Sequence, residues 1–272
     1  MFSLMECITF DRYIEAFRVL ERYSEEYPYM LGHLLEISAR YLPDGFSMLD
    51  IGAGTGHFAR SFLERCQRPV QSYTAIEPSP DHVAKIQENF RSLPVQREII
   101  NDFFTPQMTF SEKFDLIILS HCTYCFLPDP EPYLLHALSL LSGTGRVVIY
   151  QGSPANFCYF LNCILQDILP KKRVTDPTFT SWDVRNILER NRIPHSVSYL
   201  PGFLRAGEIF RPENTSLLHE LITFSLMVES ESMEPGILKR TEEILREIAY
   251  PSAEGPLLNL GVDAITVGPL KR

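Results

Sequence analysis

The sequence predicts an α/β protein built on a largely parallel sheet of seven strands, and two observations support this fold class. Between residues 46 and 151, short apolar runs alternate with segments of helical periodicity, which is typical of repeated strand-helix-strand units. The apolar runs are nearly continuous, as in strands covered by helices on both faces. We expect strands at 46–51, 71–77, 95–101, 114–120 and 145–151, and two more near 195–200 and at 262–268.

The helices predicted between these strands begin at capping or proline-containing sequences. They span 57–66, 79–91 and 131–141, and further helices are expected near 155–168, from Ser181, at 214–228 and at 236–248. The first 42 residues are predicted to be helical throughout, because Tyr13, Phe17 and Leu20 recur at helical spacing and form an apolar stripe.

The domain organisation is predicted from the lack of any linker, repeat or low-complexity tract in the sequence. We expect an N-terminal helical lid at 1–43 and one α/β domain at 44–272, with helical insertions at about 154–180 and 203–250. A helix outside such a sheet is expected to pack over an exposed surface, and the open end of the sheet, where its strands end, is the natural place. The helical additions at both ends are therefore expected to cover a substrate there.

Composition narrows the range of partners. The 272 residues are 45% hydrophobic and 22% charged, as in an ordinary globular protein, and 25 basic against 34 acidic residues give a net charge of -9. The electrostatic field of this negative charge repels nucleic acid and anionic lipid. The sequence has no signal-peptide pattern and no long apolar run, so we expect a cytoplasmic protein without a membrane partner. Because of its negative charge, we expect a small-molecule partner and no nucleic acid. We expect a monomer or a homodimer.

Six scattered cysteines are expected to be reduced. Cys122 and Cys125 form a single C-x-x-C, which could be a redox pair or half of a zinc site, but no second pair or spaced histidine pair completes it. We favour thiols packed at the end of a strand, and we predict no metal.

A glycine-rich turn is the most informative motif. The strand that ends in Asp50-Ile51 runs into Gly52-Ala53-Gly54-Thr55-Gly56, and a helix follows from His57. Residues without a Cβ allow the backbone to pass close to a ligand, and a helix N-terminus offers unpaired N–H groups. Dinucleotide sites use G-x-G-x-x-G, whereas position 57 is histidine and the spacing here is G-x-G-x-G.

Polar residues follow the next strands at the same edge of the predicted sheet. Glu77 ends the second strand, where an acid can accept both hydroxyls of a ribose. Asp102 and Phe103 end the third strand, at the level of an adenine, and Ser120 ends the fourth. Together with Asp50, Gly52, Ala53, Gly54 and Gly56, they are the predicted cofactor-binding residues.

This set of motifs resembles the class I methyltransferases. The resemblance implies a Rossmann-like sheet of seven strands whose last strand is antiparallel, and S-adenosylmethionine as the cofactor, with S-adenosylhomocysteine as the product. The fourth strand leads into Ser120-His121-Cys122-Thr123 and lacks the Asn/Asp-Pro-Pro-aromatic run of nucleic acid methyltransferases, which favours a small acceptor. An imidazole at His121 could take the proton that an amine must lose.

A closer similarity, from the N-terminal helix to the final strand, is to the histamine N-methyltransferase family. It rests on Arg12-Tyr13-Ile14-Glu15-Ala16-Phe17-Arg18 with Glu26 following, and on Glu77-Pro78-Ser79. The similarity implies that Glu26 receives the amine end of the substrate. It also implies a pocket lined by Tyr13, Phe17, His121, Tyr124, Phe157 and Asn259. The sequence departs from the family at His121, where the family has glutamine, and at Cys125, where it has tyrosine.

We therefore predict a methyltransferase that acts on a small molecule, with an amine nitrogen as the expected acceptor and His121, Glu26 and Tyr124 as the expected catalytic residues. Two alternatives stay open. The acceptor could be a carboxyl, a hydroxyl or a peptide N-terminus, or the protein could bind S-adenosylmethionine without catalysis.

Overall fold

The computed structural model describes residues 5–269, which form two compact units. The sheet unit comprises 27–151, 183–200 and 263–269, and the helical unit comprises 5–26, 152–182 and 201–262. Each unit is described by itself below. None of the helices at 5–269 has the length and apolar character to cross a membrane.

The sheet unit is built on seven strands, and only end residues of β5 and β9 fall outside it. The strands are β1 (Phe46–Ile51), β2 (Val70–Ile76), β3 (Gln96–Ile100), β4 (Phe114–Ser120), β5 (Leu141–Gly152), β6 (His195–Leu200) and β9 (Val262–Val267). Their order is β3-β2-β1-β4-β5-β9-β6. Strands β1 to β5 pair in parallel, and the last strand, β9, is antiparallel. The predicted fold class is confirmed.

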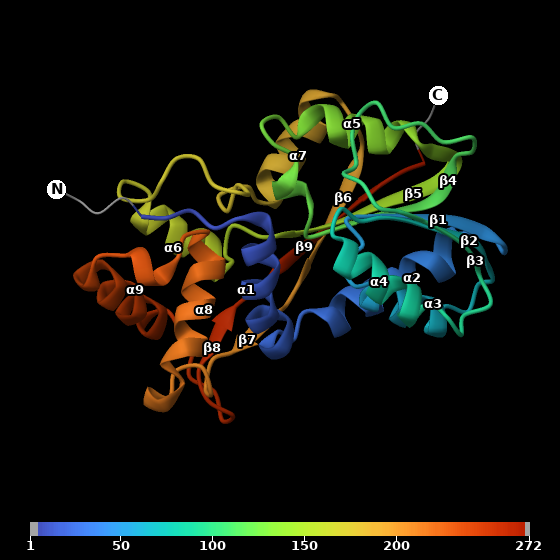
Figure 1. Ribbon diagram of the computed structural model, residues 1–272. Helices are drawn as coiled ribbons and strands as arrows, with labels where there is room; N and C mark the ends of the chain where they lie inside the picture. Colours follow the sequence, from blue (N-terminus) through green and yellow to red (C-terminus); the bar gives the residue numbers. More distant parts are fainter. Residues whose placement is uncertain (1–4, 270–272) are drawn as a thin grey trace. The chain divides into compact units, whose positions relative to one another are not determined.

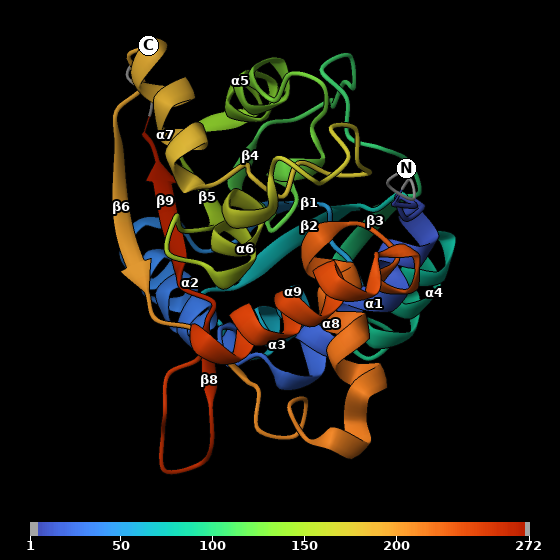
Figure 2. The same cartoon turned by 90° about the vertical axis from the view of Figure 1, so that its left-hand side faces the viewer.

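Helices cover both faces of this sheet. They are α2 (Tyr27–Tyr41), α3 (His57–Arg65), α4 (Pro80–Asn89), α5 (Glu131–Ser139) and α7 (Ser181–Arg190), with a short 3-10 turn, η1 (Thr123–Cys125). Figures 1 and 2 show α2, α3 and α4 on one face and α5 and α7 on the other. Because both faces are covered, β1 and β4 bury nearly every residue, which explains their continuous apolar sequences.

The position of the sheet's topological switch point follows from the strand order. From β1, the chain goes to β2 on one side, and β4 lies on the other side. Loops that leave the carboxyl ends of β1 and β4 therefore meet at a crevice, where open α/β sheets bind ligands. The loop that leaves β1 is Gly52–Gly56, and the turn that leaves β4 begins at His121.

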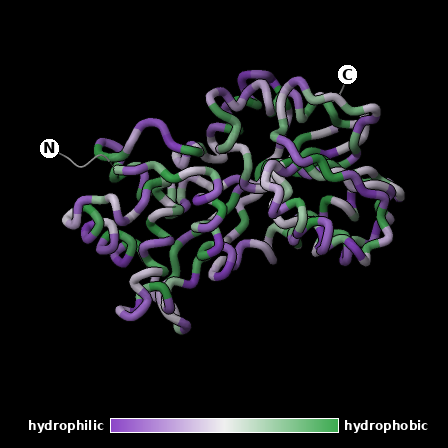
Figure 3. Tube along the Cα trace, in the orientation of Figure 1, coloured by the Kyte–Doolittle hydropathy of each residue, from purple (hydrophilic) through white to green (hydrophobic). Residues whose placement is uncertain are grey.

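The helical unit contains four helices and a small sheet within the described residues. The helices are α1 (Phe10–Tyr23), α6 (Phe157–Leu165), α8 (Thr215–Leu226) and α9 (Pro235–Glu247), with 3-10 turns η2 (Pro212–Asn214) and η3 (Ser230–Ser232) and strands β7 (Phe203–Arg205) and β8 (Leu257–Asn259). Hydrophobic and hydrophilic residues alternate along the helices in Figure 3, as expected of helices with one buried face.

One sequence prediction is wrong at the N-terminus, because residues 5–42 are not helical throughout; residues 1–4 lie outside the described residues. Helix α1 begins only at Phe10, where Thr9 caps it by accepting a hydrogen bond from the Arg12 N–H. The chain leaves the helical conformation at Ser24, and the Glu25 N–H donates to the Phe203 carbonyl at 2.8 Å. This segment pairs with β7, and a tertiary contact of that kind overrides local helix propensity.

Candidate functional site

The glycine loop adopts the backbone conformation that its sequence predicts. Gly52, Gly54 and Gly56 have φ angles of 72°, 56° and 72°, in the left-handed region that favours glycine. The loop is tied to the end of β2, since the N–H groups of Gly52 and Ala53 donate to the Ile76 carbonyl at 2.9 and 3.1 Å. Helix α3 starts directly after Gly56. The loop therefore presents its backbone beside a helix N-terminus.

The surroundings of the three glycines differ. A Cβ on Gly52 would lie 2.6 Å from the Cys122 Cβ, and a Cβ on Gly56 would lie 3.0 Å from the Phe90 ring. At Gly54, by contrast, no atom of the described residues lies within 4 Å of the Cβ position. The middle of the loop thus faces open space. A ligand can approach the backbone there, as the glycine motif requires of its ligand.

Glu77 lies against this open part of the loop. Its side chain is buried, and its Oε2 accepts a hydrogen bond from the Gly54 N–H at 2.8 Å. Its Oε1 accepts from the Ser79 N–H at 3.0 Å and lies 3.4 Å from His82 Nδ1. These contacts fix the carboxylate next to the glycine loop before any ligand binds.

Asp50 is a second buried acid at the same place, two residues before Gly52. Its Oδ2 accepts a hydrogen bond from the Tyr73 hydroxyl at 3.0 Å. Burial raises the pKa of Asp50 to about 7; the Tyr73 hydrogen bond opposes this shift and the charge of Glu77 adds to it. The Asp50 carboxyl therefore changes its charge near neutral pH.

The residues that follow β3 are exposed. Asp102 Oδ1 accepts from the Phe103 N–H at 2.7 Å, and the Phe103 side chain is 59% exposed. The Asn101 side chain donates from Nδ2 to the backbone carbonyls of Glu77 and Pro78, both at 3.0 Å. Sequence reasoning gave Asn101 no role, yet it joins the end of β3 to the Glu77 turn. The only sequence signal for Asn101 was its position next to Asp102, which was predicted to bind the cofactor.

The turn that leaves β4 is tied to β1 and β5. His121 has a φ of 49°, and its N–H donates to the Tyr150 carbonyl at 3.0 Å. The Thr123 hydroxyl donates to Gln151 Oε1 at 2.5 Å, and Cys122 Sγ donates to the Ile51 carbonyl at 3.1 Å. Ser120 is the last residue of β4 and Tyr124 lies within η1, so both belong to the same end of the sheet as the glycine loop.

The C-x-x-C pair lies in this turn. Burial raises the pKa of Cys122 well above its ordinary value and that of Cys125 to about 12, so both thiols stay protonated at neutral pH. In residues 5–269, no group of three or more His, Cys, Asp or Glu side chains is arranged to hold a metal ion. Cys122 is buried, and its Cβ lies 2.6 Å from the position that a Cβ on Gly52 would take.

In the helical unit, Tyr13 and Phe17 of α1 pack against Phe224 of α8. The ring of Phe224 lies 5.6 Å from each of the other two rings, centroid to centroid. Phe157, at the start of α6, is buried in the same unit. These aromatic residues, predicted to line a pocket, therefore belong to helices of one unit.

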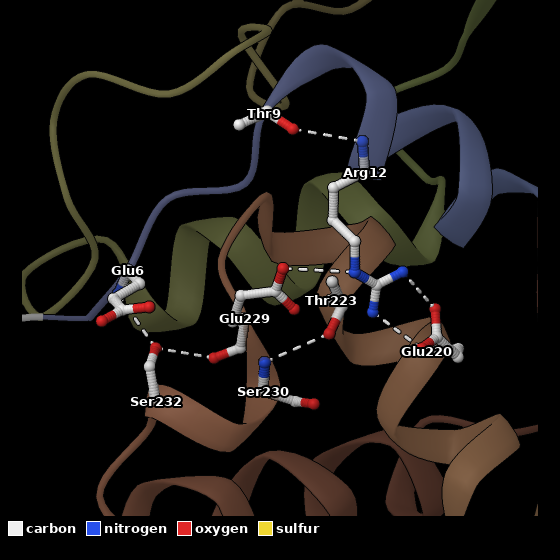
Figure 4. Close-up of polar contacts among 8 residues, drawn as sticks. All are labelled: Glu6, Thr9, Arg12, Glu220, Thr223, Glu229, Ser230 and Ser232. Atoms are coloured by element: carbon white, nitrogen blue, oxygen red, sulfur yellow. Dashed lines mark hydrogen bonds and ion pairs between the residues drawn. The ribbon is translucent and has the colours of Figure 1, made fainter.

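Figure 4 shows how the first turn of α1 is held. The Arg12 guanidinium donates two hydrogen bonds of 2.7 Å to the Glu220 carboxylate on α8 and a third, of 3.2 Å, to Glu229. Nearby, the Ser230 N–H donates to the Thr223 hydroxyl at 3.1 Å. Paired charges with this bidentate geometry are stronger than single hydrogen bonds. Sequence reasoning assigned no role to Arg12.

Glu26 is buried in the helical unit, with 4% of its surface exposed. A Cβ on Gly202 would lie 3.0 Å from the Glu26 Cβ, so these chains pass close together. Burial raises the pKa of Cys158 to about 12; its hydrogen bond with Ser225 opposes this, and the charge of Glu26 adds to it. Asn259, in β8, pairs with Phe203 and accepts a hydrogen bond from the Gly261 N–H at 2.7 Å.

The predicted site residues are thus divided between the two units. The predicted cofactor residues, together with His121 and Tyr124, lie in the sheet unit. Tyr13, Phe17, Glu26, Phe157 and Asn259 lie in the helical unit.

Comparison with known proteins gives the class of this fold. Residues 49–147 match a family model described as "Methyltransferase domain". The chain is 31% identical over 125 residues to the lovastatin nonaketide synthase mokA of Monascus pilosus, which covers 43% of this chain but 4% of that protein. The corresponding synthase component of Aspergillus terreus is 30% identical over 125 residues, with the same coverage of each chain. The chain therefore spans only a few per cent of the length of the curated relatives it matches.

Solved structures agree on the fold. The YcgJ protein of Bacillus subtilis has a TM-score of 0.55 at 15% identity, covering 87% of this chain and 96% of that one. The plantazolicin methyltransferase BamL, solved with S-adenosylhomocysteine, has a TM-score of 0.51 at 14% identity and covers 96% of both chains.

Residues 49–147 therefore match a methyltransferase domain, and the sheet has the fold of the class I, S-adenosylmethionine-dependent methyltransferases. The predicted cofactor, S-adenosylmethionine, is confirmed for this class. The similarity to the histamine N-methyltransferase family and the roles of the individual site residues stay predictions.

Proposed function

We propose that the protein transfers a methyl group from S-adenosylmethionine to an amine nitrogen of a small molecule. The observation that carries the methyl-donor half of this proposal is the Gly52–Gly56 loop. Its middle glycine faces open space, and the Glu77 carboxylate is hydrogen bonded to that glycine's N–H. This combination suits a ligand with both a ribose and a group that lies over the loop.

The residues of the sheet unit would bind the donor. S-adenosylmethionine, when bound, supplies an electrophilic methyl group on a positively charged sulfur. Each oxygen of the Glu77 carboxylate has two lone pairs, so it can accept hydrogen bonds from ribose hydroxyls besides those from the backbone. Asp102 would accept from the amine of the adenine, and the exposed Phe103 ring would lie against the base.

The residues of the helical unit would bind the acceptor. Glu26 is buried, and a buried carboxylate attracts a protonated amine strongly. Tyr13, Phe17 and Phe157 would form apolar walls that exclude water, with Asn259 as a polar contact. The amine must lose a proton before its lone pair attacks the methyl carbon. His121 would accept that proton, and Tyr124 would help to align the acceptor.

The donor half is tested by isothermal titration calorimetry with S-adenosylmethionine. The Gly54→Asp variant should lose measurable affinity, because the new side chain would fill the open space over the loop. Gly143→Asp is the matched control, since no atom of residues 5–269 lies within 4 Å of the Gly143 Cβ position either, but Gly143 lies near the start of β5. Retained affinity in the Gly54 variant would overturn the site assignment.

The acceptor half is tested with Glu26→Gln, using histamine and a panel of primary amines, with methylated products measured by mass spectrometry. We expect KM for the amine to rise by about tenfold or more while the affinity for S-adenosylmethionine is unchanged, because only the acceptor loses a charge partner. Glu25→Gln is the control, since Glu25 pairs with Arg205. Equal loss of both affinities would rule out the role of Glu26 as an amine anchor.

A second candidate acceptor is an acyl chain with carbonyl or hydroxyl groups. It is favoured by the curated relatives, which are named as polyketide synthases. A simple β-ketoacyl thioester added to the same panel distinguishes the two candidates. Methylation of the thioester with no methylated amine would favour the second candidate, and Glu26→Gln should then have little effect.

A further inference from the structure

Tyr73 is a fully buried side chain in the middle of β2 with two contacts that lead to the glycine loop. Its hydroxyl donates to Asp50 Oδ2 at 3.0 Å. Its ring stacks on the Phe90 ring, with centroids 4.6 Å apart and an interplanar angle of 14°. A buried tyrosine usually finds a partner for its hydroxyl, so the hydrogen bond alone would mean little.

The second contact extends to the far end of the loop. Phe90 follows α4, and its ring lies 3.0 Å from the position that a Cβ on Gly56 would take. Ile86 lies at a similar 3.1 Å. The loop backbone at Gly56 therefore rests directly on the ring that Tyr73 stacks against. The Tyr73 side chain thus contacts Asp50, two residues before the loop begins, and Phe90, which supports the end of the loop.

We propose that Tyr73 is a positioning residue of the methyl-donor site, which holds the Asp50 carboxyl by a hydrogen bond and, through Phe90, holds the end of the glycine loop. The inference rests on the proposed function, because it assumes that this loop binds S-adenosylmethionine. Tyr73 itself is too deeply buried to touch a ligand above the loop.

The charge of Asp50 makes this positioning role measurable through the pH dependence of ligand binding. The titratable groups that act on Asp50 are Tyr73 on β2 and Glu77 at its end, and Asp50 in turn acts on Cys122 after β4. Among these groups, only Tyr73 donates a hydrogen bond that favours the carboxylate. Since burial raises the pKa of Asp50 to about 7, the carboxyl is protonated below that pH and ionised above it. A cationic ligand binds the ionised form better.

The affinity for S-adenosylmethionine should therefore rise as the pH increases through about 7. Removing the Tyr73 hydroxyl takes away the donor that stabilises the carboxylate, so the pKa of Asp50 should rise further. The rise in affinity should then occur at higher pH. A purely structural defect would instead weaken binding by the same factor at every pH.

The test is the dissociation constant of S-adenosylmethionine from pH 6 to 8.5 for wild type and Tyr73→Phe. We expect affinity to fall by about tenfold at pH 7, which corresponds to one hydrogen bond to a charged group, and the midpoint to move to higher pH. Tyr150→Phe is the matched control, because Tyr150 is also fully buried but its hydroxyl donates to the Met30 carbonyl. Its midpoint should equal that of wild type.

The fluorotyrosine protein keeps the test decisive if Tyr73→Phe does not fold, and a double variant checks the route through Asp50 if it does. Incorporating 3-fluorotyrosine at position 73 keeps the shape and makes the hydroxyl a stronger donor, so the midpoint should move to lower pH. In an Asp50→Asn background, the Tyr73→Phe change should no longer alter the pH profile. An unchanged midpoint in the fluorotyrosine protein would overturn the inference, whether or not the phenylalanine protein folds. If wild type does not bind S-adenosylmethionine, the proposed function fails instead.

Discussion

At the scale of single residues, the three glycines of the loop are required for different reasons. Gly54 faces open space, whereas Gly52 lies against Cys122 and Gly56 lies against Phe90. All three also have positive φ angles. A substitution at Gly54 is therefore expected to affect mainly the ligand, while substitutions at the outer two glycines should affect the protein itself.

Gly52→Ala should destabilise the protein by about 2–4 kcal/mol, because the added methyl group would lie 2.6 Å from the Cys122 Cβ and the backbone has a φ of 72°. Urea unfolding followed by circular dichroism measures this loss. Gly32→Ala in α2 is the control, since nothing lies within 4 Å of its Cβ position, and it should leave stability unchanged or raise it slightly. A Gly52 variant as stable as the control would contradict the packing described here.

The glycine loop and Glu77 could be predicted from the sequence because both follow recognisable strands at a defined spacing. Asp50 was also predicted, but its partner Tyr73 was not. Tyr73 is 23 residues from Asp50 in the sequence, and only the pairing of β1 with β2 brings them together. Contacts set by strand register between polar and aromatic residues leave no local sequence signal.

At the scale of elements, α1 is held by ion pairs as well as by its apolar face. The Arg12 guanidinium joins α1 to Glu220 on α8 and to Glu229 beyond it. The hydrogen bond with Glu220 is the largest influence that raises the pKa of Arg12 above its ordinary value. The pairing therefore involves one cation and two acids in a half-buried setting.

Replacing Arg12 with Met should destabilise the helical unit by about 1–3 kcal/mol, since Glu220 and Glu229 then lose their shared cation. Hydrogen exchange should also become faster along α1. Arg60→Met is the comparison, because the Arg60–Glu64 pair of α3 is a single exposed i,i+4 contact. That change should cost less than about 0.5 kcal/mol. Equal effects would mean that the Arg12 cluster adds no more than a surface pair.

The elements themselves were predicted well where the apolar run is continuous, as in β1 and β4, or where helical periodicity is long, as in α9. The three-residue strands β7 and β8 were not predicted, because so short a segment has no measurable alternation. The break between α1 and α2 was missed for a related reason. The Glu25 N–H pairs with the distant Phe203 carbonyl, which leaves no signal in the sequence, although Pro28 in the first turn of α2 is a local sign of a helix start.

At the scale of the whole molecule, the sheet depends on β9, which lies between β5 and β6. Ile265→Ala should lower the free energy of unfolding by about 2–5 kcal/mol, because Ile265 is fully buried and its truncation leaves a cavity. Val197→Ala on β6 is the control, since its side chain is 38% exposed. Thermal unfolding by calorimetry measures both. A small loss at Ile265 would mean that β9 contributes little to the sheet.

The position of β9 also bears on how the protein is made. A ribosome synthesises β6 before β9, but β6 reaches the rest of the sheet only through β9. Until residues 262–267 have left the exit tunnel, β6 has no partner strand in the sheet, and β5 is exposed along the edge that β9 later covers. Completion of the sheet therefore has to wait for the synthesis of β9, which follows that of the other six strands.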